Sequence, residues 1–216
     1  MGSTRLPGKA LRPILHKPLL CYAIETLKRS PVIDRIVLAI PDSSGNEPLF
    51  NFACQNRIDI FTGSESNVLK RFYDASRIFE DDIYFRATGD NPIIDYNNPK
   101  RSLDVLLKEN LDYAAESGLP VGSIVEVFTR DALERTYIEG KSPEDIEHVT
   151  WYMKKSGKFK IRFFPAPPEL THPGIRLTVD YEEDFKRVTT IIETLYKDEI
   201  PPFKAVVDFV TSSQLY

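Results

Sequence analysis

The sequence is poor in the residues that build disulfide-stapled or zinc-binding proteins. Its 216 residues include only 2 cysteines, Cys21 and Cys54, and only 3 histidines. Both cysteines stand in apolar periodic stretches without a CxxC partner, so we expect buried free thiols, as suits a reducing cytoplasm. Because no His/Cys ligand spacing is present, no zinc site is expected.

A large excess of one charge sign and long apolar runs are also lacking. The 28 basic and 32 acidic residues give a formal net charge of -4. No basic stripe with interleaved aromatic side chains is present, so neither nucleic acid nor an anionic membrane is an expected partner. The N-terminus lacks the apolar core of a secretion signal, and no apolar run is long enough to span a bilayer. A cytoplasmic location is therefore expected.

The composition that remains is that of a folded domain. Hydrophobic residues make up 42% of the chain and charged residues 28%, which is typical of globular proteins with a real core. No repeat, low-complexity segment or linker divides the chain. Residues 1–216 are therefore predicted to form a single domain.

Apolar periodicity predicts an alternation of strands and helices. In the first half we expect strands at 35–40, 59–62 and 82–87, and helices at 18–28, 47–55 and 66–79. Residues 35–40 are continuously apolar, which predicts a buried, parallel strand. The second half is more mixed, with strands expected at 111–115, 123–128, 159–164 and 176–179, and helices at 133–138, 143–155, 181–197 and 203–210. This order predicts an α/β fold with right-handed crossovers.

The first nine residues combine glycines, small hydroxyls and cations. Such a loop can hold phosphates through backbone N–H groups, with Arg5 and Lys9 adding positive charge. It is not a Walker A loop, because five residues separate Gly2 from Gly8 and Ala10 follows Lys9. A tail with a Pro-Gly turn is the alternative, since a phosphate loop in an open α/β sheet normally follows a strand.

Two aspartates follow predicted strands. Asp90 comes shortly after 82–87, and Asp180 directly after 176–179. Ligands of open α/β sheets bind outside the carboxyl ends of the strands, where a carboxylate can hold a Mg2+ that bridges nucleotide phosphates. Each aspartate also has a structural alternative: Asp90 in a Gly-Asp-Asn-Pro turn, and Asp180 as the N-cap of a capping box with Glu183.

With these residues the sequence resembles the cytidylyltransferases that activate sugars with CTP. The opening loop is similar to the family's signature, and most similar to that of the spore coat polysaccharide biosynthesis protein F branch. Further blocks follow in the family's order, at 63–72, 86–95, 125–128, 147–150 and 176–185. The branch that activates 3-deoxy-manno-octulosonate shares Arg-Leu-Pro-Gly-Lys but has a different segment in place of 63–69, so the spore-coat branch fits best.

The resemblance implies a fold and an activity. The fold is the three-layer nucleotide-diphospho-sugar transferase (glycosyltransferase A-like) α/β fold, with a mostly parallel mixed sheet. The activity is transfer of CMP from CTP to a sugar or sugar acid, with release of pyrophosphate, in surface polysaccharide or glycan biosynthesis. Mg2+ is the implied cofactor. CTP and a sugar acceptor are the implied partners, and a homodimer is compatible with the resemblance.

The resemblance also assigns site residues. It implies catalytic roles for Arg5 and Lys9 and metal binding by Asp90 and Asp180. The expected nucleotide-binding residues are Gly2, Ser3, Thr4, Gly8, Arg71, Thr88 and Gly89. The expected sugar-binding residues are Pro120, Glu126, Glu147 and His148. A solvated helix-face role for Arg71, and a subunit contact or no function for Glu147 and His148, remain alternatives.

The sequence departs from the family pattern at its start. Family members usually begin with a strand that ends in Gln-Ala-Arg before Met-Gly-Ser, and here Met1 stands at that methionine. We therefore expect this central strand to be missing, residues 1 to about 9 to be mobile, and the sheet to show a gap or exposed edge. A non-catalytic, partner-binding remnant is the alternative function. The joint presence of Arg5, Lys9, Asp90 and Asp180 favours the enzyme.

Overall fold

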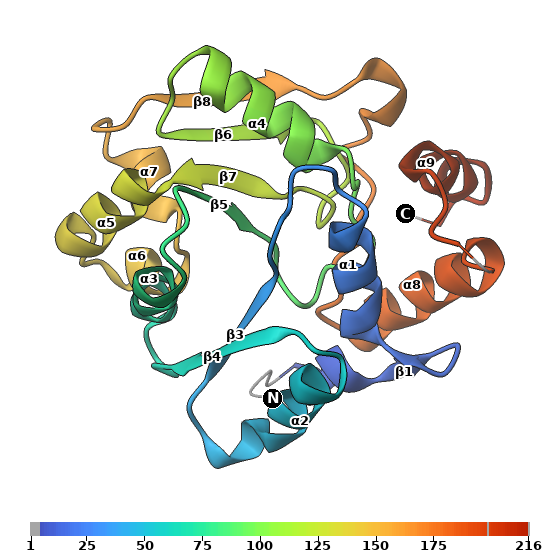
Figure 1. Ribbon diagram of the computed structural model, residues 1–216. Helices are drawn as coiled ribbons and strands as arrows, with labels where there is room; N and C mark the ends of the chain where they lie inside the picture. The colour runs from blue at the N-terminus through green and yellow to red at the C-terminus, as the bar shows by residue number, and fades with distance from the viewer. Residues whose placement is uncertain (1–4, 198, 216) are drawn as a thin grey trace.

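The computed structural model describes residues 5–197 and 199–215 (Figure 1). The helices are α1 (Leu19–Lys28), α2 (Glu47–Gln55), α3 (Val68–Phe79), α4 (Asn98–Lys108), α5 (Arg130–Glu139), α6 (Pro143–Glu147), α7 (Trp151–Lys155), α8 (Glu182–Leu195) and α9 (Phe203–Ser212). The strands are β1 (Pro13–Ile14), β2 (Lys17–Pro18), β3 (Val37–Pro41), β4 (Asp59–Gly63), β5 (Ile83–Arg86), β6 (Tyr113–Ser117), β7 (Glu126–Thr129) and β8 (Ile161–Pro165). Short 3-10 turns complete the described elements at η1 (Lys9–Leu11), η2 (Ser44–Asn46) and η3 (Pro168–Leu170).

The strands form two main sheets and one small hairpin. Strands β3 and β4 pair in parallel, and β1 pairs with β2 in an antiparallel hairpin. The other sheet has the order β5-β7-β6-β8, in which β7 is antiparallel to both neighbours and β6 is parallel to β8. Within the described part of the chain no pairing joins β3 to β5, so the expected gap in the sheet is confirmed.

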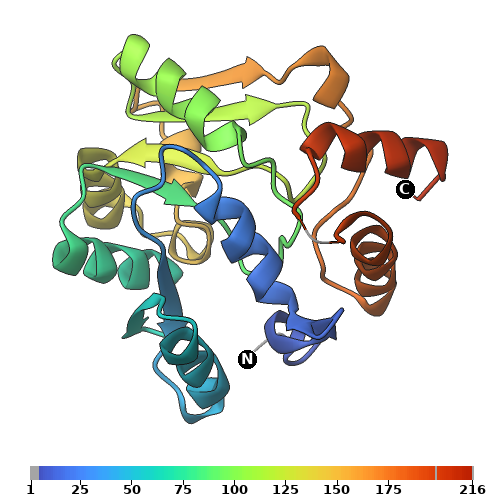
Figure 2. The same ribbon diagram turned by 45° about the vertical axis from the view of Figure 1, so that its right-hand side comes forward.

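Helices cover both faces of the four-stranded sheet, which gives three layers (Figures 1 and 2). On one face α4 packs over the inward side chains Ala114 and Val127. On the other face α3, α5 and α7 pack over Tyr113 and Phe128, whose side chains alternate with those of the first face. The three-layer α/β arrangement that the resemblance implied is therefore present.

Helix α1 links the two sheets. Its residues Leu20 and Ile24 pack with Ile40 of β3 and with α2. On the same helix Ala23 and Leu27 share a cluster with Val125, at the other sheet. The two sheets are thus held beside each other by a helix rather than by strand pairing.

The predicted elements agree with the structure except at a few places. The helix predicted at 143–155 is wrong as one element, because His148 leaves helical geometry (φ -114°, ψ 87°) and divides it into α6 and α7. The strand predicted at 176–179 is wrong as well, since only an isolated bridge joins Arg176 to Val121. Helix α4 and the hairpin were not predicted.

Burial differs from the expectation at two places. Cys54 is exposed and Cys21 is half-buried, so the prediction of two buried thiols is wrong, although both are free. In β3 only Ile40 is buried, and its neighbours are half-buried because the strand has a partner on one edge only. In the described part of the chain, no helix has the length and apolarity needed to cross a membrane.

Candidate active site

The described start of the chain lies against the segment that leads into α8. Figure 1 shows the blue N-terminal segment beside the orange start of that helix. Arg12 fastens the two together, with its Nη2 atom 3.0 Å from Glu182 Oε1 and its guanidinium 3.9 Å from the ring centre of Phe185. Leu6 is buried in the core cluster of α8 and α9. The expectation of mobility is therefore wrong for residues 5–9, and residues 1–4 lie outside the described part.

Lys9 is at the centre of the site. Its Nζ donates hydrogen bonds to Asp90 Oδ2 at 2.9 Å, to Asp180 Oδ1 at 3.3 Å and to the Val179 carbonyl oxygen at 2.6 Å. Its side chain is only 14% exposed. The fold thus brings together Lys9 of the first loop, Asp90 of the turn after β5 and Asp180 of the entry to α8, as predicted from the sequence.

The carboxylate of Asp90 is held in its ionised form. Burial raises its pKa, but hydrogen bonds from Lys9 and Thr88 outweigh this effect, so the pKa lies below the ordinary value. Thr88 and Gly89 form the turn that presents this carboxylate, closed by a 3.1 Å bond from Asn91 N to Thr88 O. These two residues therefore position the Asp90 carboxylate.

Asp180 contacts two further cations. Its Oδ1 lies 3.0 Å from Arg5 Nη2, and its Oδ2 lies 2.5 Å from Arg176 Nη2. The Arg5 guanidinium also lies over the Tyr181 ring, 5.2 Å from its centre, although the Arg5 side chain is 54% exposed. Arg176 was not predicted as a site residue, because it was expected at the start of the strand 176–179.

The predicted capping box of Asp180 and Glu183 is wrong. The N-cap of α8 is Tyr181, and its partner in the capping box is Asp184. Asp184 Oδ2 accepts the backbone N–H groups of Asp180 and Tyr181, both at 3.0 Å. Because Asp184 performs the capping, the Asp180 side chain is free to face Lys9.

The oxygens around Lys9 fit a hard divalent cation. One carboxylate oxygen from Asp90, one from Asp180 and the Val179 carbonyl face a single point, which Nζ occupies. Mg2+ prefers such oxygens and typically binds one or two protein carboxylates, with water and substrate phosphate completing its shell. The described residues include no larger acidic or His/Cys cluster. Asp90 and Asp180 are therefore the pair best suited to hold the metal.

Other predicted nucleotide-binding residues have varied positions. Gly2, Ser3 and Thr4 lie outside the described residues. Gly8 adopts a left-handed conformation (φ 71°) immediately before η1, which turns the chain so that Lys9 points back to Asp90.

Arg71 lies on α3 and is buried rather than solvated, so the helix-face alternative is wrong. Its Nη1 donates to the Ser64 carbonyl, its Nε has no hydrogen-bond partner among the described residues, and burial lowers the pKa of its guanidinium. None of these contacts joins it to the Lys9 group.

Glu126 lies opposite Arg86 in the pairing of β5 with β7. Both residues are at the end of the sheet where β5 leads into the Asp90 turn. Its Oε1 accepts hydrogen bonds from Tyr113 at 2.7 Å, Thr150 at 2.9 Å and Lys154 at 3.0 Å, and its Oε2 accepts one from Arg86 at 2.8 Å. Burial raises its pKa, yet Arg86 and Lys154 lower it to about 2. Both oxygens are thus engaged, so Glu126 orients two cations and has little capacity to bind a sugar hydroxyl itself.

The other predicted sugar-binding residues differ in accessibility. Glu147 and His148 are exposed at the end of α6, whereas Pro120 is buried. The turn after Pro120 is bonded in place, because Val121 N donates to Ile175 O at 2.8 Å and Leu177 N donates to Val121 O at 2.7 Å. Backbone hydrogen bonds therefore hold this turn against residues 175–177.

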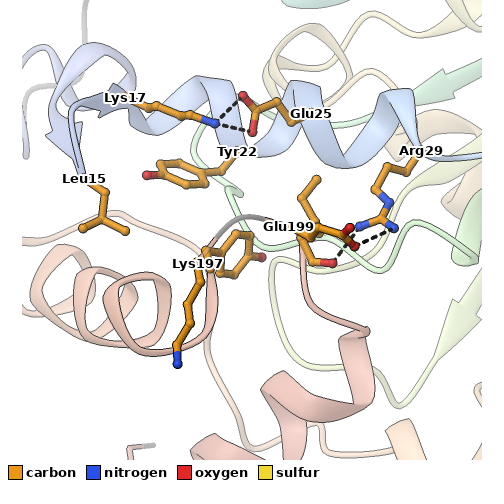
Figure 3. Close-up of a pocket in the computed structure, with 9 residues that line it drawn as sticks. Leu15, Lys17, Tyr22, Glu25, Arg29, Lys197 and Glu199 are labelled. Carbon is orange, nitrogen blue, oxygen red and sulfur yellow. Dashed lines mark hydrogen bonds and ion pairs between the residues drawn. The ribbon is translucent and has the colours of Figure 1, made fainter.

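A cavity of about 360 Å³ lies apart from these residues, between α1 and the segment after α8 (Figure 3). Four of its charged rim residues form ion pairs, with Lys17 Nζ 2.9 Å from Glu25 Oε1 and Arg29 Nη2 4.0 Å from Glu199 Oε2. None of the predicted site residues lines it.

Comparisons with known proteins identify similar sequences and structures. The family model described as cytidylyltransferase matches residues 1–199. The chain is 36% identical to an uncharacterized protein of Methanocaldococcus jannaschii, over 86% of this chain and 76% of that protein. It is 30% identical to the spore coat polysaccharide biosynthesis protein SpsF of Bacillus subtilis, over 89% of this chain and 83% of that protein. A solved cytidylyltransferase from Leptospira borgpetersenii superposes with a TM-score of 0.90 and 27% identity, covering 99% of this chain and 91% of the other.

Proposed function

Because the chain belongs to the cytidylyltransferase family, in its SpsF-like branch, we propose that it transfers CMP from CTP to a sugar or sugar acid and releases pyrophosphate. The fold class predicted from the resemblance is confirmed by the same relatives. The observation that carries the proposal is the convergence of Arg5 and Lys9 with Asp90 and Asp180. The likeness to SpsF supports a place in surface polysaccharide or glycan synthesis.

The chemistry needs positive charge at two places. An acceptor hydroxyl oxygen attacks the α-phosphorus, a new P–O bond forms, and the bond to the departing pyrophosphate breaks. Negative charge grows on the α-phosphate and on the pyrophosphate. Arg5 and Lys9 are the cations that would stabilise this charge. Held by Asp90 and Asp180, Mg2+ would neutralise phosphate oxygens and help to align the triphosphate.

We propose that the acceptor binds at the surface around Glu126, Arg86 and Lys154. Arg86 and Lys154 share this one carboxylate, so the three side chains carry a net positive charge. Their side chains are 20% and 26% exposed, which leaves part of each cation accessible to a ligand. An acidic sugar suits this positive charge better than a neutral sugar does. Glu147 and His148, which shortly precede Lys154 in the sequence, are exposed and could contact the sugar hydroxyls.

The test is pyrophosphate release from each of the four nucleoside triphosphates, with a panel of acidic and neutral sugars. We expect release only with CTP, only with an acceptor and only before a chelator is added. Turnover that persists in excess chelator would contradict the metal assignment, and a preference for UTP would contradict the choice of nucleotide. CTP binding without turnover on any acceptor would favour the non-catalytic alternative.

A further inference from the structure

The Lys9 ammonium lies between the two aspartates and contacts the carboxylate oxygens that would hold a metal ion. An ammonium group has three N–H donors. Three oxygens receive them: Asp90 Oδ2, Asp180 Oδ1 and the Val179 carbonyl oxygen. In this state Lys9 uses its full donor capacity within the protein, and none is left for a phosphate.

The two aspartates depend on Lys9 to different degrees. Asp180 also contacts Arg5 and Arg176, so it stays compensated if Lys9 moves away. Asp90 has no ion pair other than the one with Lys9 among the described residues, and its side chain is only 29% exposed. When Lys9 leaves, Asp90 is left as a largely buried charge without a cation, which is costly unless another cation arrives.

We propose that Lys9 is a displaceable resting cation of the metal site, which exchanges its aspartate contacts for nucleotide phosphate as the metal binds. The metal alone must compete with Lys9 for the same oxygens, and so it binds weakly. A nucleotide with its metal offers Lys9 a phosphate and offers Asp90 a new cation in the same event. Metal and nucleotide therefore strengthen each other's binding, and this coupling is reciprocal. The inference rests on the proposed function for the identity of the nucleotide.

The first experiment measures binding of Mn2+ alone by electron paramagnetic resonance, using Lys9→Met. Methionine keeps an unbranched apolar stem but removes the ammonium. In this variant no ammonium competes with Mn2+ for the aspartate oxygens. Because hydrogen bonds to charged groups are among the stronger ones in proteins, we expect Mn2+ to bind roughly tenfold more tightly to Lys9→Met than to the parent chain. The non-transferable analogue α,β-methylene-CTP, titrated in the presence of Mn2+, is expected to bind more weakly to the same variant.

Two variants serve as controls. Lys9→Arg keeps a cation beside Asp90 and should keep the weak Mn2+ affinity of the parent. Lys17→Met makes the same substitution at a lysine that pairs with Glu25 away from the site, and it should change neither measurement. An Mn2+ affinity of Lys9→Met within twofold of the parent value would overturn the proposal.

A second experiment uses the parent chain and so does not depend on the folding of a variant. Brief reductive methylation followed by peptide mass spectrometry reports the reactivity of each lysine. We expect Lys9 to react slowly in the protein alone and several-fold faster at saturating Mn2+, while Lys17 serves as the internal reference. Unchanged Lys9 reactivity at saturating Mn2+ would contradict displacement.

These results separate the inference from the proposed function. If Mn2+ displaces Lys9 but the analogue does not bind, the exchange stands and the nucleotide assignment fails. If the analogue binds the parent but Lys9→Met leaves the affinity for Mn2+ alone unchanged, the family function stands and the exchange fails.

Discussion

At the scale of single residues, the site depends on side chains that the core does not need. Asp90 belongs to a turn and loses mainly the contact with Lys9 when it is changed, whereas Lys9 loses its contacts with Asp90, Asp180 and the Val179 carbonyl. We expect Asp90→Ala and Lys9→Ala each to lower turnover by at least about a hundredfold, because each removes charge stabilisation from the transition state. The melting temperature of Asp90→Ala should change little, whereas Lys9→Ala should lower it, because Asp90 is left without its ion-pair partner. Pyrophosphate release and thermal unfolding of the same samples provide the measurement.

The matched control for this pair is Asp208→Ala, which removes a surface aspartate that pairs with Lys204 on α9. It should preserve turnover. A large drop in the melting temperature of Asp90→Ala would instead support a purely structural turn, as the sequence alternative held.

Glu126 gives a prediction for the dependence of stability on pH. Its pKa is about 2 in the folded protein against an ordinary value of 4.5. Ionised Glu126 therefore stabilises the fold above about pH 4.5, and this stabilisation is lost as the pH falls from there toward 2. We expect Glu126→Gln to lower the free energy of unfolding by about 2–3 kcal/mol at pH 7. The deficit should shrink as the pH approaches 2.

Urea unfolding at pH 7, 4.5 and 3 checks this expectation, with Glu193→Gln on the exposed side of α8 as the control. A deficit that is constant across the three pH values would show that Glu126 acts through packing and not through its charge.

Part of the site could be predicted from residue types and part could not. Lys9, Asp90 and Asp180 have chemistry that a phosphate site needs, and the position of Asp90 shortly after β5 was informative, whereas the strand expected before Asp180 is not formed. Arg176 was missed because it was assigned to a strand, where a neighbour four residues away does not meet it. The buried, engaged state of Glu126 depends on four partners from three separate segments, which no local pattern encodes.

At the scale of elements, two turns cross closely beside the site. Gly122 has a φ of +94°, and a Cβ there would lie 2.6 Å from Thr178 N, two residues before Asp180. We expect Gly122→Ala to lower the free energy of unfolding by at least about 2 kcal/mol and to reduce turnover, because the Thr178 backbone must shift. Gly174→Ala is the matched control, since open space surrounds that position and its φ is ordinary. Equal stability of the two variants in urea would refute the close-crossing argument.

The bounds of helices were predicted correctly where the apolar periodicity was strong, and wrongly where it was weak or did not reflect a break in the helix. Helix α2 has the predicted bounds because its apolar face is continuous and Pro48 begins it favourably. The break between α6 and α7 was not predictable, because it falls at His148, where the apolar periodicity gives no sign of an interruption. Helix α4 was missed because its first turn, Asn98–Arg101, is polar and includes a proline.

At the scale of the whole molecule, β3 and β5 each have one edge that pairs with no other described strand. A fused segment of about eight apolar-rich residues before Met1 is expected to pair with these edges, raise the melting temperature by about 5 °C and tighten CTP binding. A Gly/Ser segment of the same length is the control, because it has low strand propensity and no side chains to pack. Equal melting temperatures and CTP affinities for the two fusions would refute this expectation.

The bonds that close the active site join positions far apart along the chain. Lys9 reaches Val179, and Arg12 reaches Glu182, each across 170 residues. Contacts of such sequence separation form late in folding, because a long loop must first be closed. During synthesis from the N-terminus, the Lys9 loop therefore leaves the ribosome 171 residues before Asp180. A chain that ends before Val179 lacks the partners of Lys9 and Arg12, so the contacts of the proposed nucleotide site form only after Glu182 has been synthesised.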